Sequence, residues 1–149
     1  MSIDIRSQRI ARSAFERVER RARHDSGKPD EYLSFARSFP TMIHTSGLSQ
    51  AVAFALAKGI KQADKRHLID DLCHVLHETD CGWQLEPGEI TDGKALDCKA
   101  RNEDKVEAYM RLTRHALQAA TWIKRYAEAL LTVPETRPVD PNTEEIAKS

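Results

Sequence analysis

The chain has 149 residues, of which 31% are charged, and equal numbers of basic and acidic residues give it a formal net charge of zero. This length favours one domain with an ordinary hydrophobic core, and the neutral total excludes bulk attraction to nucleic acid while allowing a local basic face. The three cysteines do not indicate a disulfide framework, and the amino-terminal residues contain no apolar signal core, so we expect a reducing, cytoplasmic setting.

Helical spacing of apolar residues predicts two helices in the first part of the chain. In residues 3–25 one side carries Ile10, Ala11, Ala14, Phe15, Val18 and Ala22. Pro29 and the two acidic residues after it have the pattern of a first helical turn, and aromatic residues continue that second helix to Phe39. We expect Pro40 to break the chain there.

Residues 47–58 form the most apolar predicted helix. Their apolar run is far shorter than the roughly 20 residues that a membrane span needs, so no membrane partner is expected. A helix with almost no polar face is buried in protein, and we expect other helices to surround it. Ser46 can cap its amino terminus and Gly59 can end it.

Two further helices complete the predicted bundle. One covers 63–81, with an inner face that includes Leu68, Leu72 and Val75, and a long one covers 102–132 with the wide apolar arc of a central support. Residues 83–99 contain glycine, proline and scattered acids and are predicted to be a loop. The expected class is all-α: a compact bundle of about five helices in one domain, 1–132, followed by a flexible, disordered tail at 133–149.

The densest set of possible metal ligands is Cys73, His74, His77 and Cys81, with Cys98 in the predicted loop. Zinc takes four nitrogen or sulfur ligands in a tetrahedron. Residues at i, i+4 and i+8 of one helix are spread over about 12 Å along its axis, so they cannot all reach one ion. We therefore expect no metal site.

Catalytic patterns are weak. The adjacent carboxylates Asp70 and Asp71 point to different sides of a helix, and Cys73 with His77 lacks a neighbouring residue to orient the histidine. No nucleophile elbow or phosphate-binding glycine loop is present. We therefore expect no catalytic residues, no cofactor and no enzymatic activity.

Basic residues give a clearer signal, because they outnumber acidic ones in 1–37 and 101–126, whereas acids dominate 64–98. One flank of the first helix carries Arg6, Arg9, Arg17 and Arg20, with Ser13 between them, and an exposed line on the last helix carries Arg111, Arg114, Gln118 and Arg125. Lys58 and Lys61 lie where the apolar helix ends. Guanidinium groups fit phosphate oxygens, so these rows could follow a nucleic-acid backbone without reading its sequence; the alternative is an ordinary solvated face.

The aromatic residues are not predicted to form a base-stacking platform. Most of them fall on inner helix faces, as do Tyr32, Phe35, Phe39, Phe54, Tyr109, Trp122 and Tyr126. Trp83, in the predicted loop, is the exception and is expected to be exposed.

Several segments, taken in order, resemble a known family. The resemblance begins with YLSFARSFPTMI at residues 32–43, passes through Ser46-Gly47-Leu48 into an alanine-rich helix ending at Lys58, and resumes at 109–117 and 122–130. Together these segments are similar to the small subunit family of the type III-B CRISPR (Cmr) effector complex, over most of residues 5–131. Ser46 stands where the family pattern has asparagine, and the family does not account for the loop at 83–99.

The resemblance implies a non-catalytic, all-helical subunit. Several copies would stack along a filament of backbone subunits that hold the guide RNA, and would line the groove where target RNA pairs, while other subunits cleave. Base pairing would recognise sequence and the protein would supply backbone contacts. The resemblance matches Lys58, Arg111, Arg114, Lys124 and Arg125; together with Arg6, Arg9, Arg17, Arg20 and Lys61 these are the expected RNA-binding residues.

The expected partners are other Cmr-complex subunits, neighbouring copies of the chain, and the guide and target RNA duplex. The acidic middle, including Asp70 and Asp71, is expected to meet the basic face of the next copy. Three alternatives stay open: the small subunit of the sister type III-A complex, a helical adaptor with no RNA role, and a zinc-stabilised regulator. RNA in native purifications would argue against the adaptor, and stoichiometric zinc is required for the regulator.

Overall fold

The computed structural model describes residues 5–24, 29–79 and 92–131, and these segments contain six α-helices and no strand. The helices are α1 (Ile5–His24), α2 (Pro29–Ser46), α3 (Leu48–Gly59), α4 (Ala63–Glu78), α5 (Gly93–Asn102) and α6 (Val106–Leu130). The predicted all-α class is confirmed. The predicted tail at 133–149, Cys81, Trp83 and most of the predicted loop lie outside the described residues.

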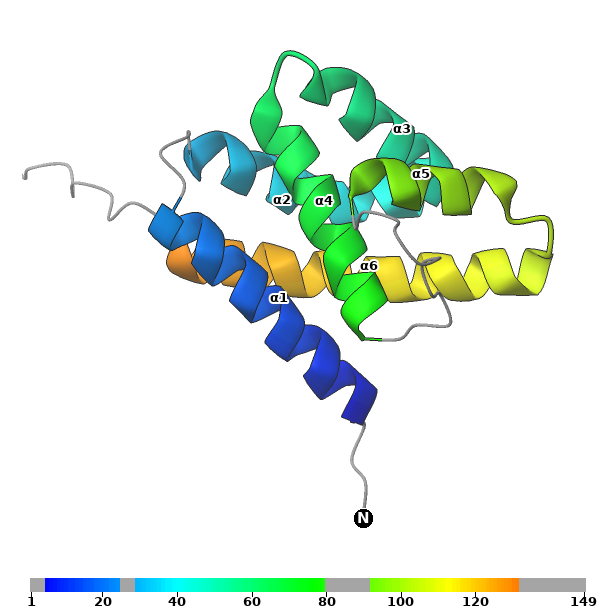
Figure 1. Cartoon of the computed structure of the whole chain (residues 1–149), viewed down its shortest axis with the longest axis horizontal. Coiled ribbons are helices and arrows are strands. Elements are labelled where there is room, and N and C mark those ends of the chain that lie inside the picture. Colours follow the sequence, from blue (N-terminus) through cyan, green and yellow to red (C-terminus); the bar gives the residue numbers. More distant parts are fainter. Residues whose placement is uncertain (1–4, 25–28, 80–91, 132–149) are drawn as a thin grey trace, which may run out of the picture.

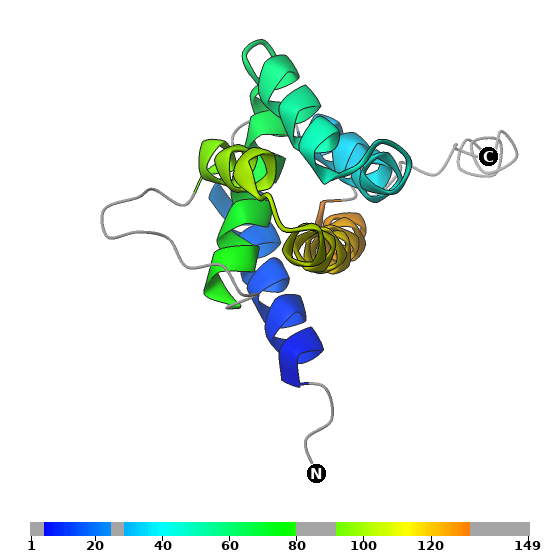
Figure 2. The same ribbon diagram turned by 90° about the vertical axis from the view of Figure 1, so that its right-hand side faces the viewer.

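Helix α4 occupies the middle of the bundle and packs against each of the other five described helices. Its apolar residues Leu68, Ile69, Leu72, Val75 and Leu76 are all buried, and they cover a wide arc that several neighbours can contact. Helix α6 packs along α1, α2 and α4, whereas α3 and α5 pack against each other and against α4 (Figures 1 and 2). None of the described helices is long and apolar enough to cross a lipid bilayer.

A buried carboxylate joins three helices. Asp71 of α4 is fully buried and accepts hydrogen bonds from Arg17 and Arg21 of α1, with Nε–Oδ distances of 3.0 Å for both. The hydroxyl of Tyr32, on α2, donates a third hydrogen bond at 2.7 Å. Burial and the neighbouring Asp71 carboxylate raise the pKa of Tyr32 well above its ordinary value of 10.0, so this hydroxyl keeps its proton and its role as donor.

The connection from α2 to α3 differs from the prediction. Pro40 lies inside α2, which continues to Ser46 because Phe39 and Ile43, four residues apart, both bury on the bundle side. Ser46 does not cap α3. Gly47 makes the turn with a positive φ of 87°, a conformation that favours glycine, and its N–H donates to the carbonyl of Ile43 at 2.9 Å.

The prediction that the helix at 47–58 is buried all round is also wrong. Leu48, Ala51, Val52 and Ala55 are buried, but the opposite side of α3 is exposed, including Phe54 with 39% of its surface accessible. Alanine is found both in cores and on surfaces, so the apolar periodicity of an alanine-rich helix does not show which of its faces is buried. Gly59 is the last residue of α3, as expected.

Helix α5 lies largely within the predicted loop, so that prediction is wrong at 93–99. Asp92 caps the helix by accepting the N–H of Ala95 at 3.1 Å, and the N–H of Gly93 donates to Asp70 of α4 at 2.7 Å. A Cβ on Gly93 would lie 2.5 Å from Cγ2 of Ile69, so glycine permits this close approach. The helix has only ten residues and few apolar positions, and packing on α3 and α4 supplies most of its stability.

We expect Asp71→Asn to lower the free energy of unfolding by about 3 kcal/mol, because it leaves the guanidinium groups of Arg17 and Arg21 without their buried counter-charge. Urea denaturation measures this loss. Asp97→Asn is the matched control, because Asp97 pairs with Arg101 on the surface of α5, and it should change stability by less than about 0.5 kcal/mol. Equal losses in the two variants would contradict a special role for Asp71.

Candidate nucleic-acid and subunit interface

Most of the predicted basic residues do lie on the surface. The exposed ones are Arg6, Arg9, Arg20, Lys58, Lys61, Arg111, Arg114 and Arg125, and Lys124 is partly exposed. The first turns of α1, which carry Arg6 and Arg9, extend beyond the rest of the bundle in both views (Figures 1 and 2). Their exposure leaves these cations available to a partner.

The prediction that Arg17 lies on an exposed flank with the other arginines of α1 is wrong. Only 19% of its side chain is accessible, and its Nη2 lies 2.9 Å from Asp71. Ser13, which was expected to fill the gap in that flank, is buried and donates to Glu78 of α4 at 2.6 Å. These two residues therefore attach α1 to α4, and the guanidinium of Arg17 is engaged within the fold.

The structure places α1 and α6, which carry most of the predicted basic residues, next to each other. A guanidinium nitrogen of Arg6 lies 3.4 Å from the Nε2 of His115, the residue that follows Arg114. Farther along the same pair of helices, the rings of Phe15 and Tyr126 lie 5.3 Å apart in an edge-to-face arrangement. The two helices thus lie side by side, but Arg9 lines a small hollow with Glu78 and Thr79 at the end of α4, so the outward cations of α1 are not all next to those of α6.

Lys58 and Lys61 belong to a different surface. They lie at the end of α3 and in the turn to α4, which is at the top of Figure 1, far from the place where α1 crosses α6. The predicted set of basic residues therefore separates into an α1–α6 group and an α3 group.

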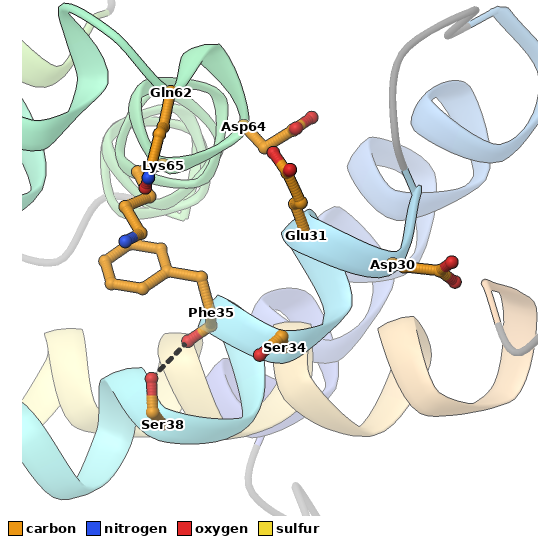
Figure 3. A pocket seen from close by; sticks show the side chains of 8 residues that line it. All are labelled: Asp30, Glu31, Ser34, Phe35, Ser38, Gln62, Asp64 and Lys65. Atoms are coloured by element: carbon orange, nitrogen blue, oxygen red, sulfur yellow. Dashed lines mark hydrogen bonds between the residues drawn. The ribbon is translucent and has the colours of Figure 1, made fainter.

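A hollow of about 340 Å³ lies beside this α3 group, between the starts of α2 and α4 (Figure 3). It is lined by Asp30, Glu31, Ser34, Phe35, Ser38, Gln62, Asp64 and Lys65. The ammonium of Lys65 lies 5.4 Å from the ring centre of Phe35 and 5.8 Å from that of Phe54. Carboxylates from two helix starts make the rim acidic, so the hollow suits a cationic group better than a phosphate.

The expected acidic docking surface also needs a correction at Asp70 and Asp71. Asp71 is buried in the ionic network with α1, and Asp70 accepts the N–H of Gly93. The pKa of Asp70 is raised from its ordinary value of 3.8 chiefly by burial, which the hydrogen bond from Gly93 opposes. Both carboxylates hold helices together, so the exposed acids of the bundle lie elsewhere, for example around the hollow.

The aromatic residues of α1 and α6 are more accessible than predicted. Phe15, assigned to the inner face of the first helix, has 38% of its surface exposed. Trp122 and Tyr126 are half-buried and stacked, with ring centres 5.7 Å apart, and the guanidinium of Arg125 lies 5.5 Å from the centre of the Trp122 ring. Phe15 lies at the edge of the apolar arc of α1, and this position in the sequence pattern could have predicted its partial exposure.

The fold separates the two cysteines that the structure describes among the possible metal ligands. Cys73 is fully buried in the core, whereas Cys98 lies exposed on α5 and accepts a hydrogen bond from Asn102 at 3.2 Å. Within the described segments no group of three or more histidine, cysteine or acidic side chains could hold a metal ion. Cys98, expected in a loop, is fixed on a helix instead.

The fold defines a small all-α bundle whose surface carries exposed basic residues on α1, α3 and α6 and exposed acids at the start of α2. The family model described as CRISPR-associated protein (Cas_Cmr5) matches residues 6–130. The chain is 38% identical over 126 residues to the CRISPR system Cmr subunit Cmr5 of Thermus thermophilus, and the match covers 85% of this chain and 96% of that protein. An X-ray crystal structure of a CRISPR-associated Cmr5 family protein, also from Thermus thermophilus, is similar with a TM-score of 0.69 and 35% identity, over 85% of this chain and 98% of that one.

The chain therefore belongs to the Cmr5 family of CRISPR-associated proteins. This membership confirms the resemblance found in the sequence and favours the Cmr family over the type III-A alternative.

The raised pKa of Asp70 predicts that its contribution to the free energy of unfolding decreases as the pH rises. A carboxyl whose pKa is raised by folding stabilises the fold below its unfolded pKa, and this contribution is lost as the pH rises through the folded pKa. Asp70→Asn keeps an oxygen to accept the Gly93 N–H but carries no charge. We therefore expect the variant to gain stability relative to the parent chain between pH 3.8 and neutral pH, as measured by urea denaturation.

Glu103→Gln is the control with the opposite sign. The pKa of Glu103 is lowered from 4.5, chiefly by its hydrogen bond with Lys99, so its carboxylate stabilises the fold above that pH and the effect is lost as the pH falls. This variant should lose stability relative to the parent chain as the pH rises toward neutral. Parallel pH trends in the two variants would refute the assignment for Asp70.

Proposed function

We propose that the chain is a non-catalytic small subunit of a type III-B CRISPR (Cmr) ribonucleoprotein, in which copies stack along the guide-RNA filament and help to hold target RNA for antiviral defence. The observation that carries this proposal is membership of the Cmr5 family over residues 6–130, with a relative named as a subunit of the Cmr system. The cytoplasm is the setting in which such a complex would act.

The exposed cations of α1 and α6 support the RNA role. The proposed contacts are Arg6, Arg9, Arg20, Arg111, Arg114, Lys124 and Arg125. Arginine side chains that neutralise phosphates release counter-ions and bind with little regard to sequence. Sequence recognition would then come from base pairing between guide and target, and the protein would supply backbone contacts.

Contacts with protein partners are the proposed role of the remaining outer faces. We infer that other Cmr-complex subunits and neighbouring copies of the chain are these partners. The carboxylates of Asp30 and Glu31 at the rim of the hollow are exposed and offer a counterpart to the arginines of another copy, a role that Asp71 cannot serve. Lys58 and Lys61 beside this hollow could serve either RNA or protein.

A helical adaptor with no RNA role is the second candidate function. It is favoured by large apolar side chains outside the core: Ile60 is 85% exposed, Val106 72% and Met110 57%. Contiguous exposed apolar surface is typical of protein-interaction sites, and Val106 and Met110 lie one turn apart at the start of α6. Both candidates need partner proteins, so bound RNA is what separates them.

Native purification tests the proposal directly. The tagged chain, isolated gently from its host, should bring down larger Cmr-type subunits together with short RNAs that share a repeat-derived end. Protein and RNA are identified by mass spectrometry and sequencing. Partners without any RNA would favour the adaptor, and the absence of both Cmr subunits and RNA would overturn the proposed assembly.

The salt dependence of RNA binding tests the contacts. If the purified chain neutralises four to six phosphates of a single-stranded RNA, the slope of log K against log salt should be roughly −3 to −4. Replacing Arg111 and Arg114 by glutamine should make the slope less steep by about 1.4. The matched control replaces Lys94 and Arg101, exposed cations of α5, and should leave the slope unchanged. Equal effects would show a diffuse charge effect instead of a defined surface.

A further inference from the structure

Three aromatic rings from two helices form a small cluster on the surface where α1 meets α6. We call Phe15, Trp122 and Tyr126 the aromatic patch. Trp122 and Tyr126 are stacked with an interplanar angle of 21°, and Phe15 meets Tyr126 edge-on at 78°. Phe15 is 38% exposed and the other two rings are half-buried, so the patch is held by the fold but open to a ligand.

Arg125 lies over the Trp122 ring of the patch. Its guanidinium lies 5.5 Å from the ring centre of Trp122, and its side chain is exposed. A cation over an exposed ring contributes little to stability, about 0.5–1 kcal/mol. This guanidinium can therefore move away from the indole at low cost and let another flat group take its place.

Helix geometry places the patch beside a line of phosphate-binding groups. Residues that are 7, 11 and 14 positions apart on a helix lie within about 60° of one another around its axis. Arg111, Gln118 and Arg125 therefore run along the same side of α6 as Trp122, over about 21 Å, and all three are exposed. Two acids lie near Phe15 on α1: Glu16 is exposed, whereas Glu19 is paired with Arg23 and repels an incoming anion less.

We propose that the aromatic patch binds an unpaired base of single-stranded RNA, a contact that rests on the proposed function and specifies its chemistry. The base stacks on Trp122 in place of the Arg125 guanidinium. That guanidinium then covers the outer face of the base or pairs with its phosphate, and Phe15 forms the side wall. Aromatic rings beside arginines are the usual means by which proteins hold unpaired bases.

The alternative occupant is an apolar side chain of another subunit. Charge favours the RNA, because the exposed residues within one turn of Trp122 on α6 are Gln118 and Arg125, although Leu130, one turn beyond Tyr126, is 37% exposed. The most exposed apolar side chains, Ile60, Val106 and Met110, lie at the ends of α3 and α6, away from the patch. A protein contact based on burial of apolar surface would more readily use those residues.

Trp122 provides its own spectroscopic probe. The chain has two tryptophans, so Trp83→Phe leaves Trp122 as the only one. We expect its fluorescence to be quenched by a uridine hexamer but not by an abasic hexamer, which carries the same phosphates without bases. Trp122→Leu should weaken binding of the uridine hexamer about tenfold, without changing the salt slope, because no charge is removed.

Phe15→Leu and Phe54→Leu are a matched pair, because the two rings are 38% and 39% exposed but only Phe15 belongs to the patch. The first should weaken binding of the uridine hexamer and the second should not. The quenching measurement leaves the patch intact, so it decides the question even if a patch variant unfolds.

The other outcomes overturn the inference. Equal binding of both hexamers without quenching would show that the bases do not stack on the patch and that binding comes from the phosphates. The proposed function would then survive. Quenching by added Cmr subunits but not by RNA would assign the patch to a protein interface. If neither hexamer binds, the base-stacking site is wrong, and the native purification still decides whether the chain belongs to an RNA-containing complex.

Discussion

The carboxylate of Asp71 is the interaction on which the arrangement of the helices depends. A fully buried charge costs several kilocalories per mole unless it is paired and hydrogen-bonded. Here two guanidinium groups from α1 and the hydroxyl of Tyr32 from α2 satisfy it, so only one placement of α1 and α2 around α4 avoids that cost. A purely apolar contact would stabilise several similar placements, whereas this network selects one.

Because α1 is fixed in this way, its remaining side is presented in a defined position beside α6. Arg17 and Arg21 face inward to Asp71, and Arg6, Arg9 and Arg20 face solvent. One helix thus carries arginines that pair with a buried carboxylate and arginines that are proposed to contact phosphate, since the same guanidinium geometry suits both anions. The internal network therefore sets the relative position of the outward cations on α1 and α6.

The sequence was sufficient where a long helix has a clear periodic pattern, as in α1, α4 and α6, and where family-typical segments occur in order. It failed where long-range contacts decide. Helix α5 is too short for a periodic apolar pattern to be detected. It forms where the N–H of Gly93 donates to Asp70 and the glycine packs closely against Ile69. The separation of Arg17 from its neighbours depends on Asp71, 54 residues away, which helical spacing cannot reveal. The exposure of Phe15 likewise depends on where α6 lies.

The RNA contacts proposed for α1 and α6 would combine two kinds of interaction with different consequences. Cations attract phosphates over distance, in a manner that salt screens and sequence hardly affects. Stacking acts only at contact, and it fixes where along the strand a nucleotide sits. A subunit that leaves sequence recognition to base pairing gains from such a fixed point, because it sets the register of the RNA without favouring any base. The rigid attachment of α1 through Asp71 would then matter for function as well as for folding, since Phe15 and Trp122 come from different helices and form one patch only when those helices are held together.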